Sequence, residues 1–269
     1  GLIGFPLGHS FSISYFNEKF HNEGIDAEYE NYEIASIESL AEILDTTPNL
    51  RGLNVTIPYK LDVMPHLTEI SEEARRIGAV NTIHIREDGC FGYNTDYIGF
   101  GRSLEHAGIA VKGRTCTVLG SGGAARAITQ YLTDNGAAAI TVVSRRPHSK
   151  PDFDNFMHHT IADIIDYNEL NRHPGGDVIV NCTPVGMYPD SDASPVNEAV
   201  VGEYGAVVDL IYNPRDTLFL QYGKKHGACT LNGMYMLVAQ AIGSEEIWLD
   251  REIEFSVVEQ LAREMEDFM

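Results

Sequence analysis

A glycine-rich turn between an apolar run and a helical pattern constrains the fold of this chain more than any other feature. Gly120, Gly122 and Ala125 occupy the key positions of the pattern G-x-G-x-x-G/A, directly after the apolar run 115–119. A helical pattern and a second apolar run, 139–144, complete a βαβ unit. In such a turn the glycines let a pyrophosphate approach the backbone, and the helix N-terminus supplies N–H donors. The pattern therefore predicts a dinucleotide-binding domain, and a glycine turn without a ligand is the alternative.

The end of the second strand of this unit indicates which dinucleotide is bound. An NAD-binding domain commonly has an acidic residue there, which binds the ribose hydroxyls. This chain has Ser144-Arg145-Arg146 instead. Because guanidinium groups bind phosphate strongly, the two arginines predict a clamp for a 2′-phosphate and NADP as the cofactor. Basic pairs also occur at 75–76 and 224–225, so the prediction depends on the position of this pair and not on its charge alone.

The order of apolar and polar segments predicts an α/β protein. Short strands and helices alternate up to about residue 97, and an Asp88-Gly89 pair there predicts a hairpin. The pattern predicts helices at 14–21 and 37–44, and strands at 50–55, 81–86, 90–93, 115–119, 139–144, 177–181 and 206–210. We expect a substrate domain at 1–97, a Rossmann-type NADP-binding domain with a parallel sheet at 98–232, and C-terminal helices at 233–269 that return to the first domain.

Composition excludes several classes of partner. With 269 residues, 43% of them hydrophobic, the chain can bury a full core. A net charge of −20 repels polyanions, so neither nucleic acid nor an anionic membrane is expected as a partner. The chain lacks a signal-peptide pattern and any apolar run near the ~20 residues of a membrane span. Four widely spaced cysteines are expected to be buried free thiols, and the protein is predicted to be cytoplasmic.

A second candidate site lies where a strand ends in polar residues and a single lysine. Pro58 should end that strand, so Lys60 should begin the next element. Asn54 and Thr56 alternate along the strand and can point into the same cleft. A later polar turn, 92–96, offers the carboxylate of Asp96. A lysine and a carboxylate among neutral donors predict a proton-transfer site, whereas a solvated lysine and a helix N-cap are the alternative roles.

Seven motifs, found in order along the whole chain, resemble those of the shikimate dehydrogenase family. They are GFPLGHSFS (4–12), NVTIPYK (54–60), GAVNT (78–82), GYNTD (92–96), NCTPVGM (181–187), DLIYNP (209–214) and GMYMLVAQ (233–240). The resemblance implies a reversible, NADP-dependent reduction of 3-dehydroshikimate to shikimate, a step toward chorismate and the aromatic amino acids. It also implies a small-molecule substrate. No metal ion is expected, because His158-His159 lack acidic or cysteine partners at ligand spacing.

The resemblance further implies a role for individual residues. Lys60 would transfer the proton, and Asp96 would be its partner. The substrate carboxylate and ring hydroxyls would be bound by Ser10, Ser12, Asn54, Thr56, Asn81, Asp96, Tyr212 and Gln240. The cofactor would be bound by Gly120, Ser121, Gly122, Gly123, Ala124, Ser144, Arg145, Arg146, Ser149, Leu210 and Gly233, with a rim contact from Glu72.

The chain departs from the family pattern at three places. The family usually has proline after the second serine and histidine before the next asparagine, where this chain has Ile13 and Phe16. We expect only altered packing there. Where the family usually has an Asn-Arg-Thr cofactor motif, this chain has Ser144-Arg145-Arg146. A family helix within 147–160 is expected to be short in this chain.

Two other functions are compatible with these motifs. One is an NAD-dependent quinate/shikimate dehydrogenase, and the other is a non-catalytic ligand-sensing module that keeps the fold. Intact Lys60 and Asp96 argue against the second. Either a monomer or a homodimer is expected.

Overall fold

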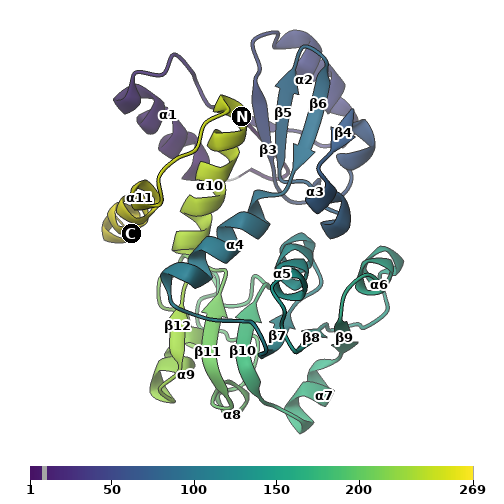
Figure 1. The fold of residues 1–269 in the computed structure, drawn as a ribbon, viewed down its shortest axis with the longest axis vertical. Coiled ribbons are helices and arrows are strands. Elements are labelled where there is room, and N and C mark those ends of the chain that lie inside the picture. Colours follow the sequence, from purple (N-terminus) through teal and green to yellow (C-terminus); the bar gives the residue numbers. More distant parts are fainter. Residues whose placement is uncertain (8–10, 269) are drawn as a thin grey trace. The chain divides into compact units, whose positions relative to one another are not determined.

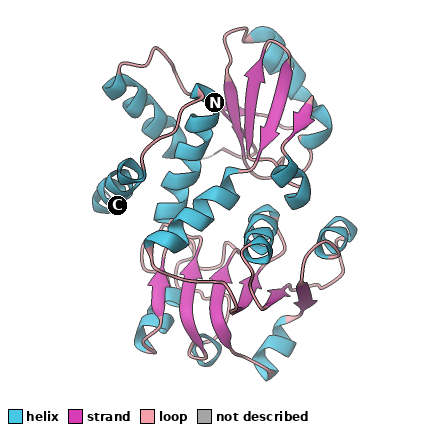
Figure 2. Ribbon diagram, viewed as in Figure 1, coloured by secondary structure: helices cyan, strands magenta, loops and turns pink. Residues whose placement is uncertain are grey.

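Within residues 1–7 and 11–268, which the computed structural model describes, the chain folds into two compact units, each with a six-stranded sheet (Figure 1). One unit comprises Gly1–Thr95 with Ser244–Arg251, and the other comprises Asp96–Gly243 with Glu252–Met269. Helices and strands alternate in both (Figure 2). None of the helices in the described ranges is long and apolar enough to cross a membrane. The division at residues 97 and 232 stays a prediction.

The first unit contains a mixed sheet. Its elements are β1 (Leu2–Gly4), α1 (Phe11–Glu23), β2 (Asn31–Glu33), the 3₁₀-helix η1 (Ile37–Ser39), α2 (Leu40–Thr46), β3 (Gly52–Val55), the 3₁₀-helix η2 (Met64–His66), β4 (Glu69–Ile70), α3 (Glu72–Ile77), β5 (Thr82–Arg86) and β6 (Gly89–Tyr93). The strand order is β2-β1-β3-β5-β6-β4. β5 is antiparallel to β3 and β6, and the other pairs are parallel. The hairpin predicted at Asp88-Gly89 is confirmed, because it joins β5 to β6.

The topology of this sheet brings polar loops to one edge. The core beneath the sheet contains Leu53, Ile83 and Leu40, all nearly inaccessible to solvent. β1 and β3 run parallel, so the segments that follow both strands leave at the same edge. β5 runs the other way and places Thr82 opposite Asn54, so its first residues lie at that edge too. The residues that directly follow β1 and β3 therefore lie at the same edge as the start of β5.

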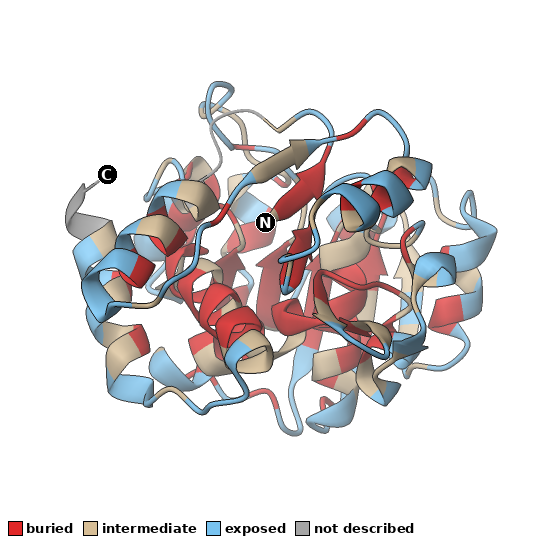
Figure 3. Ribbon diagram, turned by 90° about the horizontal axis from the view of Figure 1, so that it is seen from above, coloured by how far each residue is buried: buried red, intermediate tan, exposed pale blue. Residues whose placement is uncertain are grey.

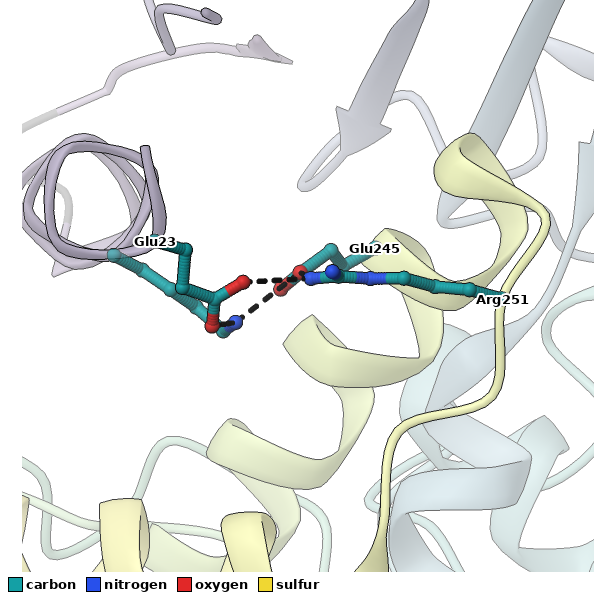
Figure 4. A network of polar contacts seen from close by, with 4 residues as sticks. Glu23, Glu245 and Arg251 are labelled. Atoms are coloured by element: carbon teal, nitrogen blue, oxygen red, sulfur yellow. Dashed lines mark hydrogen bonds and ion pairs between the residues drawn. The ribbon is translucent and has the colours of Figure 1, made fainter. Parts of the chain in front are cut away.

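The first unit also contains the end of a long helix, α10 (Met234–Leu249). Trp248 donates from Nε1 to the Ile83 carbonyl at 2.9 Å. A Cβ on Gly52 would lie 2.1 Å from the same nitrogen, so only glycine allows this close packing. The buried Glu245 binds Arg251 and Lys19, which also bind Glu23 (Figure 4). These contacts hold α1 against the end of α10.

The second unit is a Rossmann fold. Its elements are α4 (Thr95–His106), β7 (Thr115–Leu119), α5 (Gly123–Asp134), β8 (Ala139–Val143), α6 (Pro151–Met157), β9 (Ala162–Ile165), α7 (Tyr167–Arg172), β10 (Gly176–Asn181), α8 (Glu198–Val201), β11 (Tyr204–Asp209), α9 (Leu218–Lys225), β12 (Cys229–Leu231), most of α10, and α11 (Phe255–Phe268). All strand pairs are parallel, in the order β12-β11-β10-β7-β8-β9. This is the doubly wound order 6-5-4-1-2-3, so the predicted fold class is confirmed.

The core of the second unit lies along its central strands. Ile179 of β10 and Val207 of β11 are fully buried and pack with Phe219 of α9. In Figure 3, buried residues, drawn in red, gather along the strands. Strands of a parallel sheet are covered on both faces, which explains why these segments are continuous apolar runs. On α5, Arg126 is buried, binds Asp152 of α6, and stacks over the Phe153 ring at 5.3 Å. These contacts fix α6 against α5.

Several expectations about local structure need correction. β2, β4, β9 and β12 were not predicted from the sequence. The helix within 147–160 is short, as expected, because α6 has 7 residues. All four cysteines are free thiols, as predicted, but only Cys116 is fully buried, Cys90 and Cys182 are partly buried, and Cys229 is exposed.

Candidate functional site

The catalytic lysine candidate lies at the polar edge of the first unit. The sequence predicted that Lys60 begins the next element, but Lys60 stands within a run of turns between β3 and η2. Its backbone carbonyl accepts a hydrogen bond from Val80 N at 2.7 Å. Thr56, in the same connection, donates its backbone N–H to the Ile3 carbonyl at 2.9 Å. Lys60 and Thr56 are both half-buried, which is the burial expected of residues that line a cleft.

Asn81 is fixed by contacts with the residue that starts α4. Its Oδ1 accepts a hydrogen bond from Thr95 N at 2.7 Å, and its Nδ2 donates to Thr95 Oγ1 at 3.0 Å. Asn81 is 3% exposed, and Thr82 and Thr95 are fully buried. The predicted ligand Asn81 is therefore held in one orientation beside β5.

The side chain of Asn54 makes hydrogen bonds to other residues of the first unit. Its Oδ1 accepts from the Tyr29 hydroxyl at 2.8 Å, and its Nδ2 donates to Ser244 Oγ at 2.8 Å. Longer contacts of 3.4 Å reach the Asn81 carbonyl and Thr82 Oγ1. Asn54 thus links β3 to β5 and to the end of α10, and its direct contact with substrate stays a prediction. Sequence reasoning missed Tyr29, because a lone tyrosine in a polar connection carries no pattern.

Of the two serines predicted for the substrate carboxylate, only one can be described. Ser10 lies outside the described residues. Ser12 is the second residue of α1 and is half-buried, so its contact with the substrate carboxylate stays a prediction.

In the second unit, Asp96 and Gln240 lie on neighbouring helices. Asp96 is buried in the first turn of α4 and is not its N-cap, which corrects the alternative role considered for it. A Cβ on Gly99, one turn later, would lie 2.9 Å from the Met236 carbonyl and 3.0 Å from Gln240 Cβ. Glycine at position 99 therefore allows α4 and α10 to pack closely and brings both predicted ligands together.

Asp96 also lies near the loop after β10. Burial raises the pKa of the Cys182 thiol, and the charges of Asp209 and Asp96 raise it further. Cys182 belongs to the 181–187 motif, so this electrostatic contact places Asp96 beside a predicted cofactor loop. The thiol stays protonated and is no nucleophile.

A buried carboxylate holds two predicted cofactor loops together. Asp209, at the end of β11, accepts from Asn181 Nδ2 at 2.9 Å, from Thr217 Oγ1 at 2.7 Å and from Ile211 N at 3.1 Å. Burial raises the pKa of Asp209 to about 6, although these hydrogen bonds act to lower it. The network fixes the loop that carries Leu210 and the half-buried Tyr212, whose pKa is also raised by burial.

Gly233 follows β12 and approaches that same loop. Its backbone N–H donates to the Ile211 carbonyl at 3.0 Å. A Cβ there would lie 2.0 Å from the Leu210 carbonyl oxygen, so glycine is required for the close approach. The structure thus brings Leu210 and Tyr212, both of the 209–214 motif, close to Gly233 of the 233–240 motif.

The glycine-rich turn has the geometry of a dinucleotide site. Gly120 has a φ of +112°, which favours glycine. Gly122 is the N-cap of α5, and no side chain caps this helix. A Cβ on Gly122 would meet no atom within 4 Å, so the space above the helix N-terminus is open. Backbone donors with a helix dipole behind them fit a pyrophosphate, and Ser121, Gly123 and Ala124 surround the turn.

The segment after β8 adds positive charge next to this turn. Ser144 Oγ lies 3.3 Å from Ser121 Oγ and accepts from Arg146 N at 3.3 Å. Arg145 and Arg146 are exposed, and Ser149 Oγ donates to the Arg146 carbonyl at 2.7 Å. Lys150, which sequence reasoning overlooked, donates from Nζ to the Ser121 carbonyl at 3.2 Å. This arrangement fits the 2′-phosphate of NADP.

The last predicted contact lies in the first unit. Glu72 is exposed and opens α3, whose N-cap is Ser71, so its cofactor rim contact stays a prediction. Among the residues that the structure describes, no group of three or more histidine, cysteine or acidic side chains could hold a metal ion.

Comparisons with known proteins agree with this arrangement. The family model "Shikimate dehydrogenase substrate binding domain" matches residues 2–83. The chain is 40% identical to the shikimate dehydrogenase (NADP(+)) of Clostridium beijerinckii, over 97% of this chain and 95% of that one. A solved chorismate mutase/shikimate 5-dehydrogenase fusion protein from Clostridium acetobutylicum is 48% identical, with a TM-score of 0.91, over 99% and 96%. A 5-ketofructose reductase of Gluconobacter is 32% identical, with a TM-score of 0.83, over 98% and 97%.

The Rossmann sheet, the glycine turn and the basic segment after β8 define an NADP-dependent oxidoreductase. The mixed sheet of the first unit matches a substrate-binding domain. By its similarity over nearly the full length, the chain belongs to the shikimate dehydrogenase family.

Proposed function

We propose that this protein catalyses the reversible, NADP-dependent reduction of 3-dehydroshikimate to shikimate, a step in aromatic biosynthesis. The observation that carries the proposal is full-length similarity to enzymes of that name, combined with the glycine turn and basic segment of the second unit. Neither feature alone identifies a substrate, since the Rossmann fold serves many dehydrogenases.

The cofactor is held by backbone and by charge. The N-terminus of α5 binds the pyrophosphate, and Arg145 and Arg146 bind the 2′-phosphate that distinguishes NADP from NAD. Ser121, Ser144 and Lys150 fix the loop that carries the two arginines. When bound, NADPH supplies the hydride that reduces the carbonyl group.

The substrate is held by neutral donors and acceptors. Ser10, Ser12 and Tyr212 bind its carboxylate, because in a chain with a net charge of −20 an anion needs local donors. Its ring hydroxyls are bound by Thr56, Asn81, Asp96 and Gln240, and Asn54 supports this set from β3. Amide and hydroxyl groups suit a polyol, since every buried hydroxyl needs a partner.

Lys60 and Asp96 carry the proton chemistry. Reduction of a ketone leaves charge on its oxygen, and an ammonium group in hydrogen-bond reach stabilises that charge and gives up a proton. Lys60 has this role, with Asp96 as its partner. In the reverse direction Lys60 accepts the proton from the substrate hydroxyl.

Two other activities remain as alternatives. A quinate/shikimate dehydrogenase that uses NAD lacks support from the basic segment at Arg145 and Arg146. Reduction of 5-ketofructose is favoured by the similarity to the Gluconobacter enzyme, but that sugar has no carboxylate for the serine loop to bind. We expect a monomer or homodimer that acts in the cytoplasm.

The test is direct conversion of 3-dehydroshikimate by the purified chain with NADPH. NADPH oxidation should require 3-dehydroshikimate, and shikimate should be recovered as the product. Absence of turnover with 3-dehydroshikimate, together with rapid turnover of 5-ketofructose, would replace the proposed function by that of a sugar reductase.

A further inference from the structure

A buried cluster of polar side chains surrounds the start of β5 in the first unit. Its members come from β3, from the first residues of β5 and the residue before them, from the first residue of α4 and from the end of α10. They are Asn54, Asn81, Thr82, Thr95 and Ser244, and each is at most 8% exposed. Because buried polar groups must find partners in the protein, the hydrogen bonds within this cluster fix the orientation of its members.

The amide of Asn54 has one orientation. Its Nδ2 lies 3.4 Å from the backbone carbonyl of Asn81, which can only accept, so the nitrogen must be on that side. Its Oδ1 then accepts from the Tyr29 hydroxyl at 2.8 Å on the other side. The same Nδ2 donates to Ser244 Oγ at 2.8 Å. Ser244 is therefore an acceptor toward β3.

The amide of Asn81 is oriented in the same way. Its Oδ1 lies 2.7 Å from the backbone N–H of Thr95, which can only donate, so this atom is the oxygen. Thr82 Oγ1 donates to the same oxygen at 3.0 Å, and Asn81 Nδ2 donates to Thr95 Oγ1 at 3.0 Å. Two donors thus converge on the oxygen of a side chain that is predicted to bind a ring hydroxyl of the substrate.

The contact between Ser244 and Thr82 connects these two amides. The two hydroxyl oxygens are 2.8 Å apart, whereas Thr95 Oγ1 is 3.3 Å from Ser244 Oγ. A hydroxyl has one proton to donate, and Thr82 gives its proton to Asn81 Oδ1. Ser244 must therefore be the donor in its contact with Thr82. The hydrogen bonds run in one direction, from Asn54 through Ser244 and Thr82 to Asn81.

Loss of the Ser244 hydroxyl would break this chain in the middle. Thr82 Oγ1 would lose its donor, and its proton could turn from Asn81 toward Thr95 Oγ1, 3.2 Å away. Asn81 Oδ1 would keep the Thr95 N–H but lose a donor that the rest of the chain polarises. The Asn81 amide would then be held less firmly, and a ligand would lose affinity because it has to order that amide on binding.

We propose that Ser244 is a positioning residue for substrate binding, which acts through Thr82 to hold the Asn81 amide in the orientation that binds a ring hydroxyl. This inference rests on the proposed function, because it takes Asn81 as a ligand of the substrate. Ser244 acts through its neighbours and does not touch the substrate.

The first test is the Ser244→Ala variant, which removes one oxygen atom from a helix that tolerates alanine well. We expect the KM for shikimate to rise roughly three- to tenfold, with kcat and the KM for NADP changed by less than about twofold. Ser103→Ala is the matched control, because Ser103 is a buried serine of α4 whose hydroxyl donates to the Phe100 carbonyl of its own helix at 2.7 Å. It should leave the KM for shikimate unchanged.

A pair of substitutions at position 82 separates the hydrogen bond from packing. Thr82→Val keeps the shape of the side chain and removes its hydroxyl, so it should raise the KM for shikimate as Ser244→Ala does. Thr82→Ser keeps the hydroxyl and removes a methyl group, so it should leave this KM within about twofold of the wild type. These two variants also test the chain of hydrogen bonds without any change in α10.

A double-mutant cycle tests whether Ser244 acts through Asn81. If it does, Ser244→Ala should add nothing to the KM for shikimate of an Asn81→Ala variant. A normal KM in Ser244→Ala, equal effects of Thr82→Ser and Thr82→Val, or additive effects in the cycle would overturn the inference and leave the proposed function intact. A normal KM in Asn81→Ala would overturn both the assignment of Asn81 and the role of Ser244. Absence of shikimate turnover by the wild-type chain would overturn the proposed function itself.

Discussion

Lys150 donates a hydrogen bond from its ammonium group to the carbonyl oxygen of Ser121 at 3.2 Å. This contact joins the basic segment after β8 to the glycine-rich turn after β7, two neighbouring parallel strands. The guanidinium groups of Arg145 and Arg146 are thereby kept on a segment that is tied to the pyrophosphate turn. We propose that this arrangement sets the preference of the chain for NADP over NAD.

Replacing Arg145 and Arg146 together by glutamine should raise the KM for NADP at least tenfold and change the KM for NAD by less than about twofold, since only NADP has the 2′-phosphate. Initial rates at saturating shikimate measure both constants. Lys224 and Lys225, another basic pair of the same unit, provide the matched control, because they bind Asp216 and Glu198. Equal losses for both cofactors would rule out a phosphate clamp.

Replacing Lys60 by alanine should lower kcat by on the order of 10²- to 10⁴-fold, with a much smaller change in the Kd of shikimate, because proton transfer is lost while the other donors remain. Turnover and calorimetric binding would be measured on the same preparation. Lys112→Ala removes an exposed lysine and is the control. A Lys60 variant with normal kcat would exclude this lysine from the mechanism.

The charge cluster on α1 and α10 predicts a large effect on stability. Lys19 and Glu245 are buried, so Lys19→Met should lower the free energy of unfolding by on the order of 3 kcal/mol, because it leaves a buried carboxylate with one cation fewer. Lys224→Met breaks an exposed ion pair with Asp216 and should cost under about 1 kcal/mol. Urea unfolding measures the free energy of unfolding of both variants. Similar small losses in the two variants would show that the buried cluster stabilises the chain no more than an exposed ion pair does.

The buried Asp209 predicts a pH dependence of stability. Its folded-state pKa, about 6, lies above the ordinary value, so the folded chain binds this proton more tightly than the unfolded chain does. The stabilisation from that proton is complete below the ordinary pKa of an aspartate and is lost as the pH rises through about 6. Asp209→Asn removes the titration. The free energy of unfolding of the variant minus that of the wild type should therefore rise by on the order of 3 kcal/mol between about pH 4 and pH 7.

Asp177 is the control for the sign of this effect. Hydrogen bonds from Thr115 and the nearby Arg114 lower the pKa of Asp177. The corresponding difference for Asp177→Asn should therefore fall as the pH rises through the acidic range. If the difference in free energy of unfolding between Asp209→Asn and the wild type did not vary with pH, the pKa of Asp209 would not be raised in the folded chain.

Much of this fold is predictable because its signals are local. β7 was predicted at its observed bounds, since a continuous apolar run ends in a glycine that must adopt a positive φ. The Rossmann-type domain with its parallel sheet was predictable from the repeated β-turn-α units. The missed strands β9 and β12 are short and half-exposed, and they form only because β8 and β11 offer them a partner edge.

The candidate site was predictable to a similar degree, for a similar reason. Residues in contiguous motifs, such as Gly120 and Gly122, are recognisable because their spacing lies within one turn, and the positive φ of Gly120 favours glycine. Tyr29 and Ser244 were missed because they gain their role only when distant segments pack together. Lys150 lies just beyond the predicted cofactor segment, and only the fold shows that it reaches back to Ser121.

The most direct test of the central claim is an initial-rate comparison of the purified protein with shikimate and quinate, each with NADP and NAD. We predict that kcat/KM is highest for shikimate with NADP, at least about tenfold above shikimate with NAD, because the chain has two arginines after β8, at the place where NAD-binding domains commonly have an acidic residue for the ribose. Faster turnover of quinate with NAD, or no activity with shikimate and NADP, would contradict the account.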